Sequence, residues 1–525
     1  MRRTARWLAF VAALLTLALS LGLIHEFREL PPVVSVASPG AAGEAAAVRP
    51  IQPRFEFRDH WFTLGADQPN RRGFEFDLYF GLDGVSLTLI VLTALLTVSC
   101  VLISWDSIRE REPEFYASLL ILETALIGAF CAFDVVLFYV FFEFTLIPLF
   151  FLIGVWGGPQ RRYAAIKFFL FTLTGSLVTL VGLVAVVLYA SAGGLANPSS
   201  MPDLAAWLAA NPPRLEYQYA FFLALSTGFM VKVPVFPLHT WLPLAHTEAP
   251  TAGSVLLAGL LLKLGTYGFL RLCLPMFPHA CVNLGLPLIA ALGVAGILYG
   301  SLTALAQRDI KKLVAYSSVA HLGFCLLGLF ALNSEGLSGA VLQMLNHGLS
   351  TGGLFLLVGM IYDRYHTRQL DELRGLAARI PLIAVATVFI SMASIGLPGL
   401  NGFVGEFLSL IGMYKRNPVY AVLGTAGIVL GAWYLLSMLQ QAFFGPLREP
   451  ARHGDAVRDM NIREALAIVP IAVACLAIGV RPQPLLEIIK PDVEAVAGLY
   501  AAAAAEPLIA QDASRPAAPV SEPEP

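Results

Sequence analysis

Long apolar runs recur along this chain, and each is close to the length that crosses a lipid bilayer as a helix. A span needs roughly 20 apolar residues, and about thirteen runs approach this length. The runs cover residues 5–24, 84–104, 114–132, 133–155, 164–190, 217–236, 251–272, 281–305, 312–332, 336–362, 381–414, 418–444 and 462–480. Only 13% of the 525 residues are charged, against about 25% in soluble domains. We therefore expect an all-α, polytopic membrane protein.

The two ends of the chain and one long loop differ from this pattern. Residues 1–24 begin with basic residues, as a signal peptide does, but the apolar run is long, so we expect a retained membrane helix. The polar segment 25–83 contains "RFEFRDHWFTL" and "FEFDLYFGLDG", whose alternating apolar residues predict a β-hairpin in a non-cytoplasmic loop. The Ala/Pro-rich segment 500–525 is predicted to be a disordered tail.

Basic residues gather in alternate connections between the runs. The connections on one side carry Arg109, Arg111, Arg161, Arg162, Arg308, Lys311, Lys312, Arg364, Arg368, Arg374, Arg379, Arg448, Arg452 and Arg458, in step with Arg2, Arg3 and Arg6. The opposite short connections are nearly bare, apart from Arg214, Lys415 and Arg416. Because cytoplasmic loops are enriched in Lys and Arg, we expect a cytoplasmic N-terminus and, after thirteen spans, a periplasmic C-terminus in a bacterial inner membrane.

Two of the runs contain residues that interrupt a helix. Pro234 and Pro237 directly follow Lys232, and "GLPGLNGFVGEF" lies inside the run 381–414. Proline removes a backbone hydrogen bond. In a membrane such a break is stable only where it is buried in protein or faces water. We therefore expect both breaks to lie in the interior of the bundle.

The positions of the breaks predict an internal repeat. Five runs per unit give repeats over residues 114–272 and 281–446, each with its break in the fourth run. A second membrane helix with its cytoplasmic loop, 84–113, precedes them, and a final helix, 462–480, follows. Since five is odd, the second repeat enters the membrane from the opposite face. Paired broken helices in inverted repeats indicate a transport site near the bilayer midplane.

Several ionisable side chains lie inside the predicted spans, where each costs roughly 2.5–3.5 kcal/mol to insert. They are Glu123, Glu143, Lys232, Lys263, His321, His347 and Glu406. Each also has a structural explanation, as an inert buried ion pair for Glu143 with Lys232, or as hydrogen bonding between helices for Glu123 and the histidines. Taken together, the acids, lysines and imidazoles indicate a proton relay along the midplane.

The chemistry of these groups suits proton transfer. Burial favours the neutral form of a lysine or glutamate, and an opposite charge favours the charged form. A lysine beside a movable glutamate can therefore load or release a proton as the pair closes or opens. Histidine changes charge near neutral pH and suits the intermediate steps. The break after Lys232 would expose that lysine to freed backbone groups and water.

Other site chemistries find little support. The six cysteines are scattered without a CxxC pair, so the sequence predicts no iron–sulfur or zinc motif. The glycines of "GLPGLNGFVG" lie between helical runs and do not fit a phosphate-binding loop. The net charge of -2 gives no reason to expect nucleic-acid binding. We expect no metal or cofactor in this chain.

Four stretches carry a family resemblance. "KVPVFPLHTWLPLAHTEAPTAGSVLLAGLLLKLGTYGFLR", "DIKKLVAYSSVAHLGF", "QMLNHGLSTGGLF" and "GLPGLNGFVGEF" resemble signatures of the antiporter-like membrane subunits of respiratory complex I, the proton-pumping NADH:quinone oxidoreductase. The resemblance covers about residues 75–485. It implies a proton-translocating subunit without a redox centre, with flavin, iron–sulfur clusters and quinone in partner subunits. It also implies sister antiporter-like subunits on both sides in the bilayer.

The resemblance also implies roles for particular residues. Glu143 and Lys232 would form the coupling pair, Lys263 the central relay lysine and Glu406 the distal exchange residue. The two histidines would line the relay. The alternative is a subunit of a multisubunit cation/proton antiporter or of a membrane-bound hydrogenase-type complex. Glutamate at Glu406 favours complex I, because the sister subunits and the antiporters more often have lysine there. Two departures are Phe142, where the family often has tryptophan, and one N-terminal helix fewer than usual.

Overall fold

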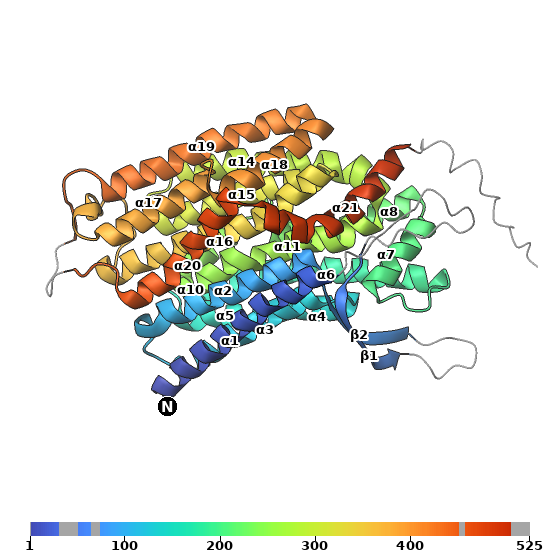
Figure 1. The fold of residues 1–525 in the computed structure, drawn as a ribbon, viewed down its shortest axis with the longest axis horizontal. Coiled ribbons are helices and arrows are strands. Elements are labelled where there is room, and N and C mark those ends of the chain that lie inside the picture. Colours follow the sequence, from blue (N-terminus) through green and yellow to red (C-terminus); the bar gives the residue numbers. More distant parts are fainter. Residues whose placement is uncertain (1, 31–50, 65–73, 451–456, 506–525) are drawn as a thin grey trace, which may run out of the picture.

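The bundle consists of long helices packed side by side, with a β-hairpin projecting from one end (Figure 1). The computed structural model describes residues 2–30, 51–64, 74–450 and 457–505. In the first half lie α1 (Arg2–Glu29), β1 (Arg54–Leu64), β2 (Phe74–Leu82), α2 (Gly84–Ser107), α3 (Glu112–Cys131), α4 (Val135–Phe144), α5 (Leu146–Trp156), α6 (Arg161–Ala192), α7 (Met201–Ala210), α8 (Leu215–Lys232) and α9 (Leu242–Glu248).

A central helix and a second set of helices complete the bundle. The central helix consists of α10 (Thr251–Leu256), the π-helical segment η1 (Leu257–Leu261), α11 (Leu262–Gly268), the π-helical segment η2 (Phe269–Cys273) and α12 (Leu274–Met276). It is followed by α13 (Pro278–Ala280), η3 (Cys281–Gly285), α14 (Leu286–Leu305), α15 (Ile310–Phe330), α16 (Ser334–Tyr365), η4 (Leu376–Ala378), α17 (Pro381–Ile395), α18 (Asn401–Arg416), α19 (Pro418–Phe443), α20 (Ile462–Val480) and α21 (Gln483–Ala505).

Eleven of the described helical stretches are long and apolar enough to cross a membrane. The two predicted runs that do not qualify are 217–236 and 381–414, the two in which the sequence places a break. The nearly all-helical, multi-pass fold is thus confirmed. The count of thirteen spans and the inverted relation of the repeats stay predictions.

Both predicted breaks are present. The helix α8 ends at Lys232, and the next helix, α9, begins only at Leu242. The helix α17 ends at Ile395, and α18 begins at Asn401 after a turn in which Gly396 and Gly399 have φ angles of +83° and +92°. Only glycine adopts this left-handed region without strain. The glycines of the "GLPGLNG" motif therefore make this turn possible.

The predicted β-hairpin is confirmed, and it is tied to the bundle. Strands β1 and β2 pair antiparallel. The amide of Phe133, which lies between α3 and α4, donates to the carbonyl of Tyr79 at 2.9 Å. Arg58 Nε donates to Asp77 Oδ2 at 2.7 Å, and the amide of Asn197 donates to the same oxygen at 2.8 Å. The Arg58–Asp77 bond joins the two strands, and the contacts of Phe133 and Asn197 dock the hairpin on the loops at that end of the bundle.

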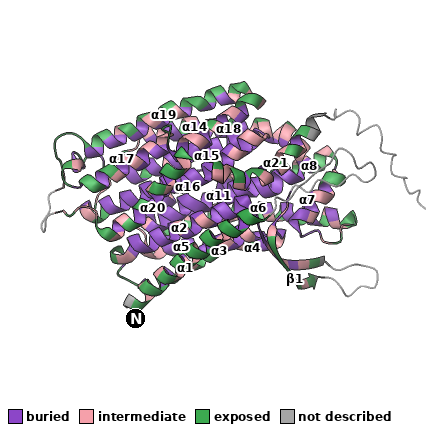
Figure 2. Cartoon of the chain, in the orientation of Figure 1, coloured by how far each residue is buried: buried purple, intermediate pink, exposed green. Residues whose placement is uncertain are grey.

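Burial separates the centre of the bundle from its periphery (Figure 2). In the most apolar stretch of the central helix 100% of the residues are buried, whereas in that of α1 only 17% are buried.

Two helices, α7 and α21, were not predicted from the sequence. Helix α21 continues to Ala505, into the segment 500–525 predicted to be disordered, and residues 506–525 lie outside the described residues.

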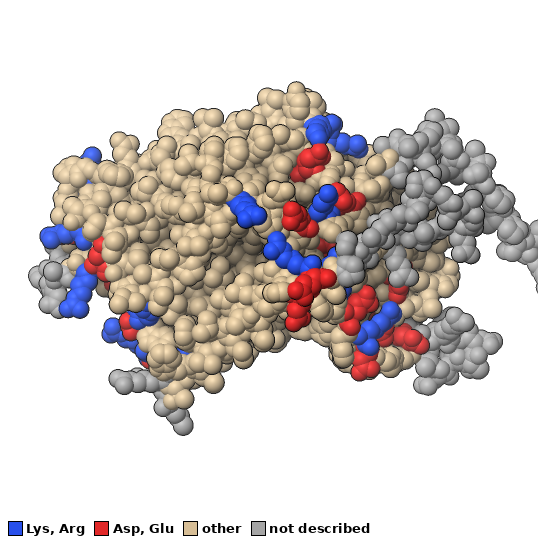
Figure 3. Space-filling model, viewed as in Figure 1, with Lys and Arg blue, Asp and Glu red and all other residues tan. Residues whose placement is uncertain are grey.

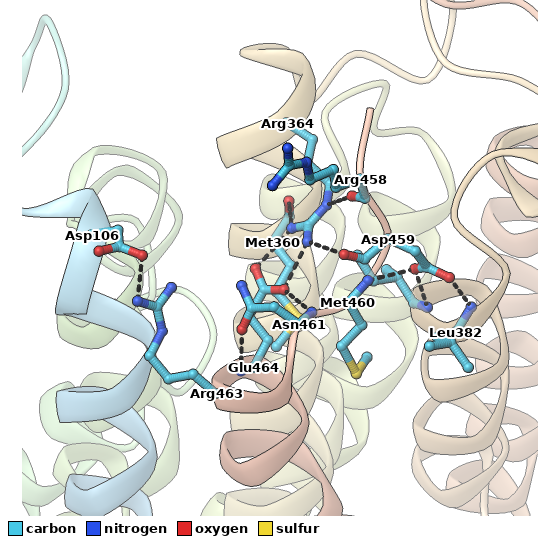
Figure 4. Close-up of polar contacts among 11 residues, drawn as sticks. Asp106, Met360, Arg364, Leu382, Arg458, Asp459, Met460, Asn461, Arg463 and Glu464 are labelled. Carbon is cyan, nitrogen blue, oxygen red and sulfur yellow. Dashed lines mark hydrogen bonds and ion pairs between the residues drawn. The ribbon is translucent and has the colours of Figure 1, made fainter. Parts of the chain in front are cut away.

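On the face shown in Figure 3, charged side chains gather at one end of the bundle and in a band toward the other end, with a broad uncharged surface between them. At the end where α1 begins, ion pairs join several helices (Figure 4). Arg364 of α16 forms two hydrogen bonds with Glu464 of α20, at 2.8 and 2.7 Å. Arg463 of α20 pairs with Asp106 of α2, and Asp459 accepts from backbone amides at the start of α17. These contacts fix the ends of α2, α16, α17 and α20 relative to one another.

Candidate functional site

A lysine and a histidine are in contact at the centre of the bundle. Lys263 lies on α11 in the central helix and is fully buried. Its Nζ lies 2.6 Å from Nδ1 of His347 on α16 and also contacts the carbonyl of Ala258. Both residues were singled out from the sequence, and the structure brings them together.

The second broken helix presents a carboxylate to the other predicted histidine. Glu406, on the second turn of α18, has its Oε1 2.9 Å from Nδ1 of His321 on α15. The same oxygen accepts a hydrogen bond from the amide of Gln343 at 3.0 Å. On the opposite side of the ring, Nε2 of His321 lies 3.2 Å from the Ser394 hydroxyl and 3.3 Å from the Tyr434 hydroxyl. Glu406 and His321 therefore bind each other and are held by side chains from three other positions in the bundle.

The two histidines join these contacts into one row. The ring centroids of His321 and His347 are 5.7 Å apart. Nε2 of His347 is buried and has no hydrogen-bond partner among the described residues. Lys263, His347, His321 and Glu406 thus form a continuous line of ionisable groups, which we call the distal row. Each neutral imidazole can accept a proton on one nitrogen and donate from the other, so the distal row has the composition of a proton relay.

The helix that carries Lys263 is irregular on both sides of it. The π-helical segments η1 and η2 flank α11. Such segments are rare and are frequently found at functional sites. Gly259, Gly265 and Gly268 let neighbouring helices approach this helix closely. A Cβ at Gly265, for example, would lie 2.8 Å from the carbonyl oxygen of Phe229. Close packing and irregular winding together define where Lys263 points.

The predicted coupling pair has a different geometry. Lys232, the last residue of α8, is buried, and its Nζ donates to the carbonyl of Phe142 at 3.1 Å. The same Nζ lies 3.8 Å from the centroid of the Phe142 ring. Glu143 follows on α4, and its Oε1 is buried without a hydrogen-bond partner. Among the residues that the structure describes, no direct ion pair joins Glu143 to Lys232, although their charges are close enough to interact.

The first break is supported by a buried tryptophan. The indole Nε1 of Trp241 donates to the carbonyl of Val231 at 3.0 Å. This carbonyl belongs to the last turn of α8, which has no following turn to supply a backbone donor. Trp241 is fully buried. It therefore satisfies one of the backbone groups that the break leaves free beside Lys232.

Sequence reasoning missed a further buried histidine, which lies near Lys263. His246 on α9 is completely buried, and neither ring nitrogen has a hydrogen-bond partner among the described residues. Its ring stacks on Phe355 with centroids 4.6 Å apart, and it is close enough to Lys263 and Lys311 for their charges to interact. The signal was an imidazole in the apolar stretch "LPLAHTEAP", which was overlooked because it follows the break.

Glu123 stands apart from the other predicted residues. It is buried on α3, and its Oε1 has no hydrogen-bond partner in the described part of the chain. Its electrostatic neighbour is Cys100 on α2. No described contact connects Glu123 to the distal row or to Lys232. A role for Glu123 stays a prediction from the sequence.

Comparison with known proteins identifies relatives over most of the chain. The family described as "NADH:quinone oxidoreductase/Mrp antiporter, TM" matches residues 132–431. NADH-quinone oxidoreductase subunit M of Rhodobacter capsulatus is 40% identical over 498 residues, which cover 94% of this chain and 90% of the relative. NADH-ubiquinone oxidoreductase chain 4 of Marchantia polymorpha is 42% identical over 412 residues, covering 78% and 81%.

A solved structure shows the same fold. A chain of respiratory complex I from Thermus thermophilus with bound NADH superposes with a TM-score of 0.78 at 32% identity. The match covers 94% of this chain and 95% of that chain. The likeness therefore extends over nearly the whole length of both chains.

Proposed function

Because this chain belongs to the family of NADH:quinone oxidoreductase and Mrp antiporter membrane subunits, we propose that it is the antiporter-like, proton-translocating subunit M of a respiratory NADH:quinone oxidoreductase. It is the counterpart of chain 4 in the eukaryotic relative. It acts as a membrane subunit of that enzyme and holds no redox centre of its own. Electron transfer in partner subunits drives proton movement through the groups described above.

The observation that carries this proposal is the distal row. Four ionisable side chains from α11, α16, α15 and α18 meet in the interior of a membrane protein, where each is costly to bury. Intramembrane ionisable groups of this kind mark ion and proton pathways. Their number and their sequence of contacts favour transport over a purely structural role.

Proton transfer along the distal row follows from its contacts. Nζ of Lys263 gives a proton to Nδ1 of His347, and His347 releases a proton from Nε2 toward His321 through water. Nε2 of His321 receives it beside the hydroxyls of Ser394 and Tyr434, and Nδ1 of His321 passes its own proton to Oε1 of Glu406. Glu406 then exchanges with the non-cytoplasmic side through the second break.

The other half of the pathway starts at Glu143 and Lys232. We assign these two as the coupling pair, with an ion pair that forms and breaks during turnover. In the structure the pair is open, since Lys232 binds the carbonyl of Phe142 instead. A water-filled connection past His246 would carry the proton from Lys232 to Lys263 in the central helix. Glu123 is assigned no step, because nothing described connects it to either group.

The protein spans the membrane many times as part of a multisubunit respiratory complex, beside other membrane subunits. We assign it to the bacterial inner membrane with a cytoplasmic N-terminus. The Lys and Arg residues of the connections in step with the N-terminus support this orientation. The repeats over 114–272 and 281–446 would then be inverted about the midplane.

Purification from the native membrane tests the proposal. In a mild detergent, the chain should co-purify with flavin and iron–sulfur subunits that oxidise NADH, and with sister antiporter-like subunits. Co-purification with antiporter subunits alone, and sodium-dependent proton exchange without NADH, would instead establish the cation/proton antiporter. Glu406 in place of lysine argues against that outcome.

A further inference from the structure

The C-terminal helix α21 caps a helix that lies far away in the sequence. Oδ2 of Asp492 accepts from the backbone amides of Gly84 at 2.8 Å and Val85 at 3.3 Å, at the start of α2. Oδ1 of Asp83 accepts from the amide of Ser86 at 2.8 Å. The first amides of a helix otherwise lack partners, and negative charge there is stabilising. Two carboxylates, one of them from α21, therefore complete this helix start.

The backbone of α21 packs directly against the same point. A Cβ at Gly84 would lie 2.0 Å from the carbonyl oxygen of Ile488 on α21. Glycine at position 84 is thus required for the approach. Helix α21 also packs against α16 and the end of the central helix. Figure 1 shows it lying across the bundle.

A buried arginine links this cap to the central helix. Arg271 lies in η2, about two helical turns from Lys263. Its side chain is buried and forms an ion pair with Asp83, and its Nη2 donates to the Ser86 hydroxyl at 3.3 Å. The guanidinium lies 4.9 Å from the ring centroid of Tyr267, which is one turn from Lys263. Arg271 therefore fixes the central helix to the start of α2, on the side that Asp492 caps.

A second bond joins α21 to the central helix directly. The hydroxyl of Tyr500, which is buried, donates to the carbonyl of Leu274 at 2.7 Å. Tyr267 is held in turn by its hydroxyl, which lies 3.0 Å from the Ser86 hydroxyl and donates to the carbonyl of Phe130 at 3.0 Å. These bonds join α2, α21 and the central helix in one buried polar network, in which Nε of Arg271 has no hydrogen-bond partner among the described residues.

We propose that Asp83, Arg271 and Asp492 form a latch through which the C-terminal helix α21 positions Lys263 for proton transfer. Arg271 touches none of the proton-carrying groups in its described contacts, so it is a positioning residue. The central helix departs from regular winding on both sides of Lys263, in the π-helical segments η1 and η2, and such segments are frequent at functional sites. Holding its η2 end constrains the direction of the Lys263 side chain toward His347. The inference rests on the proposed function of Lys263.

The test compares single substitutions in the intact complex, reconstituted in vesicles. Asp492→Asn keeps an oxygen that can accept from Gly84 and removes the charge. It should lower the protons translocated per NADH oxidised by about fivefold, within the range by which remote residues change coupling. Glu494→Gln is the matched control on the same helix, because Glu494 is exposed and pairs only with Lys490 among its described partners. That control should translocate protons at the wild-type ratio.

Two further variants separate positioning from simple loss of structure. Arg271→Lys keeps the positive charge and should retain part of the proton translocation that Arg271→Leu loses. In Asp492→Asn, amide hydrogen exchange should rise in residues 262–276, which contain Lys263. If only residues 483–500 exchange faster and translocation is unchanged, α21 merely braces the C-terminus and the latch is refuted. The same holds if Asp492→Asn fails to assemble and Arg271→Leu translocates normally.

The proposed function can fail separately from the latch. Normal translocation by Lys263→Ala would remove the function assigned to that lysine, whatever the latch variants do. Impaired Lys263→Ala beside normal Asp492→Asn and Arg271→Leu would leave the function intact and refute the latch alone.

Discussion

The two broken helices present their charged residues in opposite ways. At the second break, Glu406 is bound by His321 and Gln343, and the chain of contacts continues through His347 to Lys263. At the first break, Lys232 is bound to a backbone carbonyl and an aromatic ring, and one Glu143 oxygen has no hydrogen-bond partner among the described residues. The second break thus leads into the connected distal row, whereas at the first break no direct ion pair joins Glu143 to Lys232 among the described residues.

This difference indicates which half of the proposed proton pathway moves during turnover. A buried polar atom without a partner is costly, so an arrangement in which Glu143 meets Lys232 would remove the cost at Glu143 Oε1. The distal row is more constrained, because Lys263, His321 and Glu406 are each bound by neighbouring groups and only Nε2 of His347 lacks a partner among the described residues of the row. We infer that the Glu143–Lys232 pair is the moving element and that the distal row is a fixed conductor.

The largest expected effect comes from removing the moving acid. Glu143→Ala leaves Lys232 buried without an acidic partner, a state that is strongly unfavourable for a charged lysine. Lys232 should then stay neutral, so proton pumping should be lost and quinone reduction by NADH slowed, with the complex still assembled. Proton uptake in vesicles at equal complex content measures this, with the exposed Glu114→Ala on α3 as control. Pumping at the wild-type rate would show that Glu143 has no coupling role.

A smaller loss is expected at the fixed end. Glu406→Gln keeps the shape of the side chain and its contact with His321 but cannot bind and release a proton. Pumping should fall by about tenfold, equivalent to 1.4 kcal/mol on the limiting barrier. Glu406→Lys should retain part of the activity, because the sister subunits of the family that this chain resembles more often have lysine at that position. Undiminished pumping by the glutamine variant would make Glu406 a structural acid.

The smallest effect tests whether the distal row is as fixed as its contacts indicate. Tyr434→Phe removes one of the two hydroxyls at Nε2 of His321 and leaves the Ser394 hydroxyl in place. Pumping should fall by about two- to threefold, in keeping with the loss of one hydrogen bond. Tyr420→Phe on the same helix α19 is the control, because its hydroxyl contacts only the carbonyl of Pro287 among the described residues. Equal rates in both variants would show that the row tolerates rearrangement.

Much of this architecture could be predicted from the sequence, because burial in a membrane leaves strong patterns. The apolar runs, both helix breaks and the hairpin follow from composition, proline and glycine positions, and alternation. The intramembrane charges identified Lys263, His321, His347 and Glu406, which the structure brings together. Sequence position could not show that Lys232 binds the Phe142 carbonyl, since that depends on how α4 meets the end of α8.

Other features were beyond sequence reasoning for identifiable reasons. The short helix α9 is too brief to register as a span, so His246 was missed. Helix α21 contains Pro491 and several polar residues, and its hydrogen-bond partners at Gly84, Val85 and Leu274 lie hundreds of positions away. The π-helical winding around Lys263 leaves no pattern in a single sequence. Each of these depends on contacts between distant segments.

Lys263 is the end of the distal row that would connect it to the Glu143–Lys232 pair, so substituting this lysine is the most direct test of the proposed relay. The measurement is the number of protons translocated per NADH oxidised by the intact complex carrying Lys263→Ala, in sealed vesicles. The account predicts a ratio well below that of the wild-type complex, because no group would connect Lys232 to His347. A ratio equal to the wild-type value, with the complex fully assembled, would contradict it.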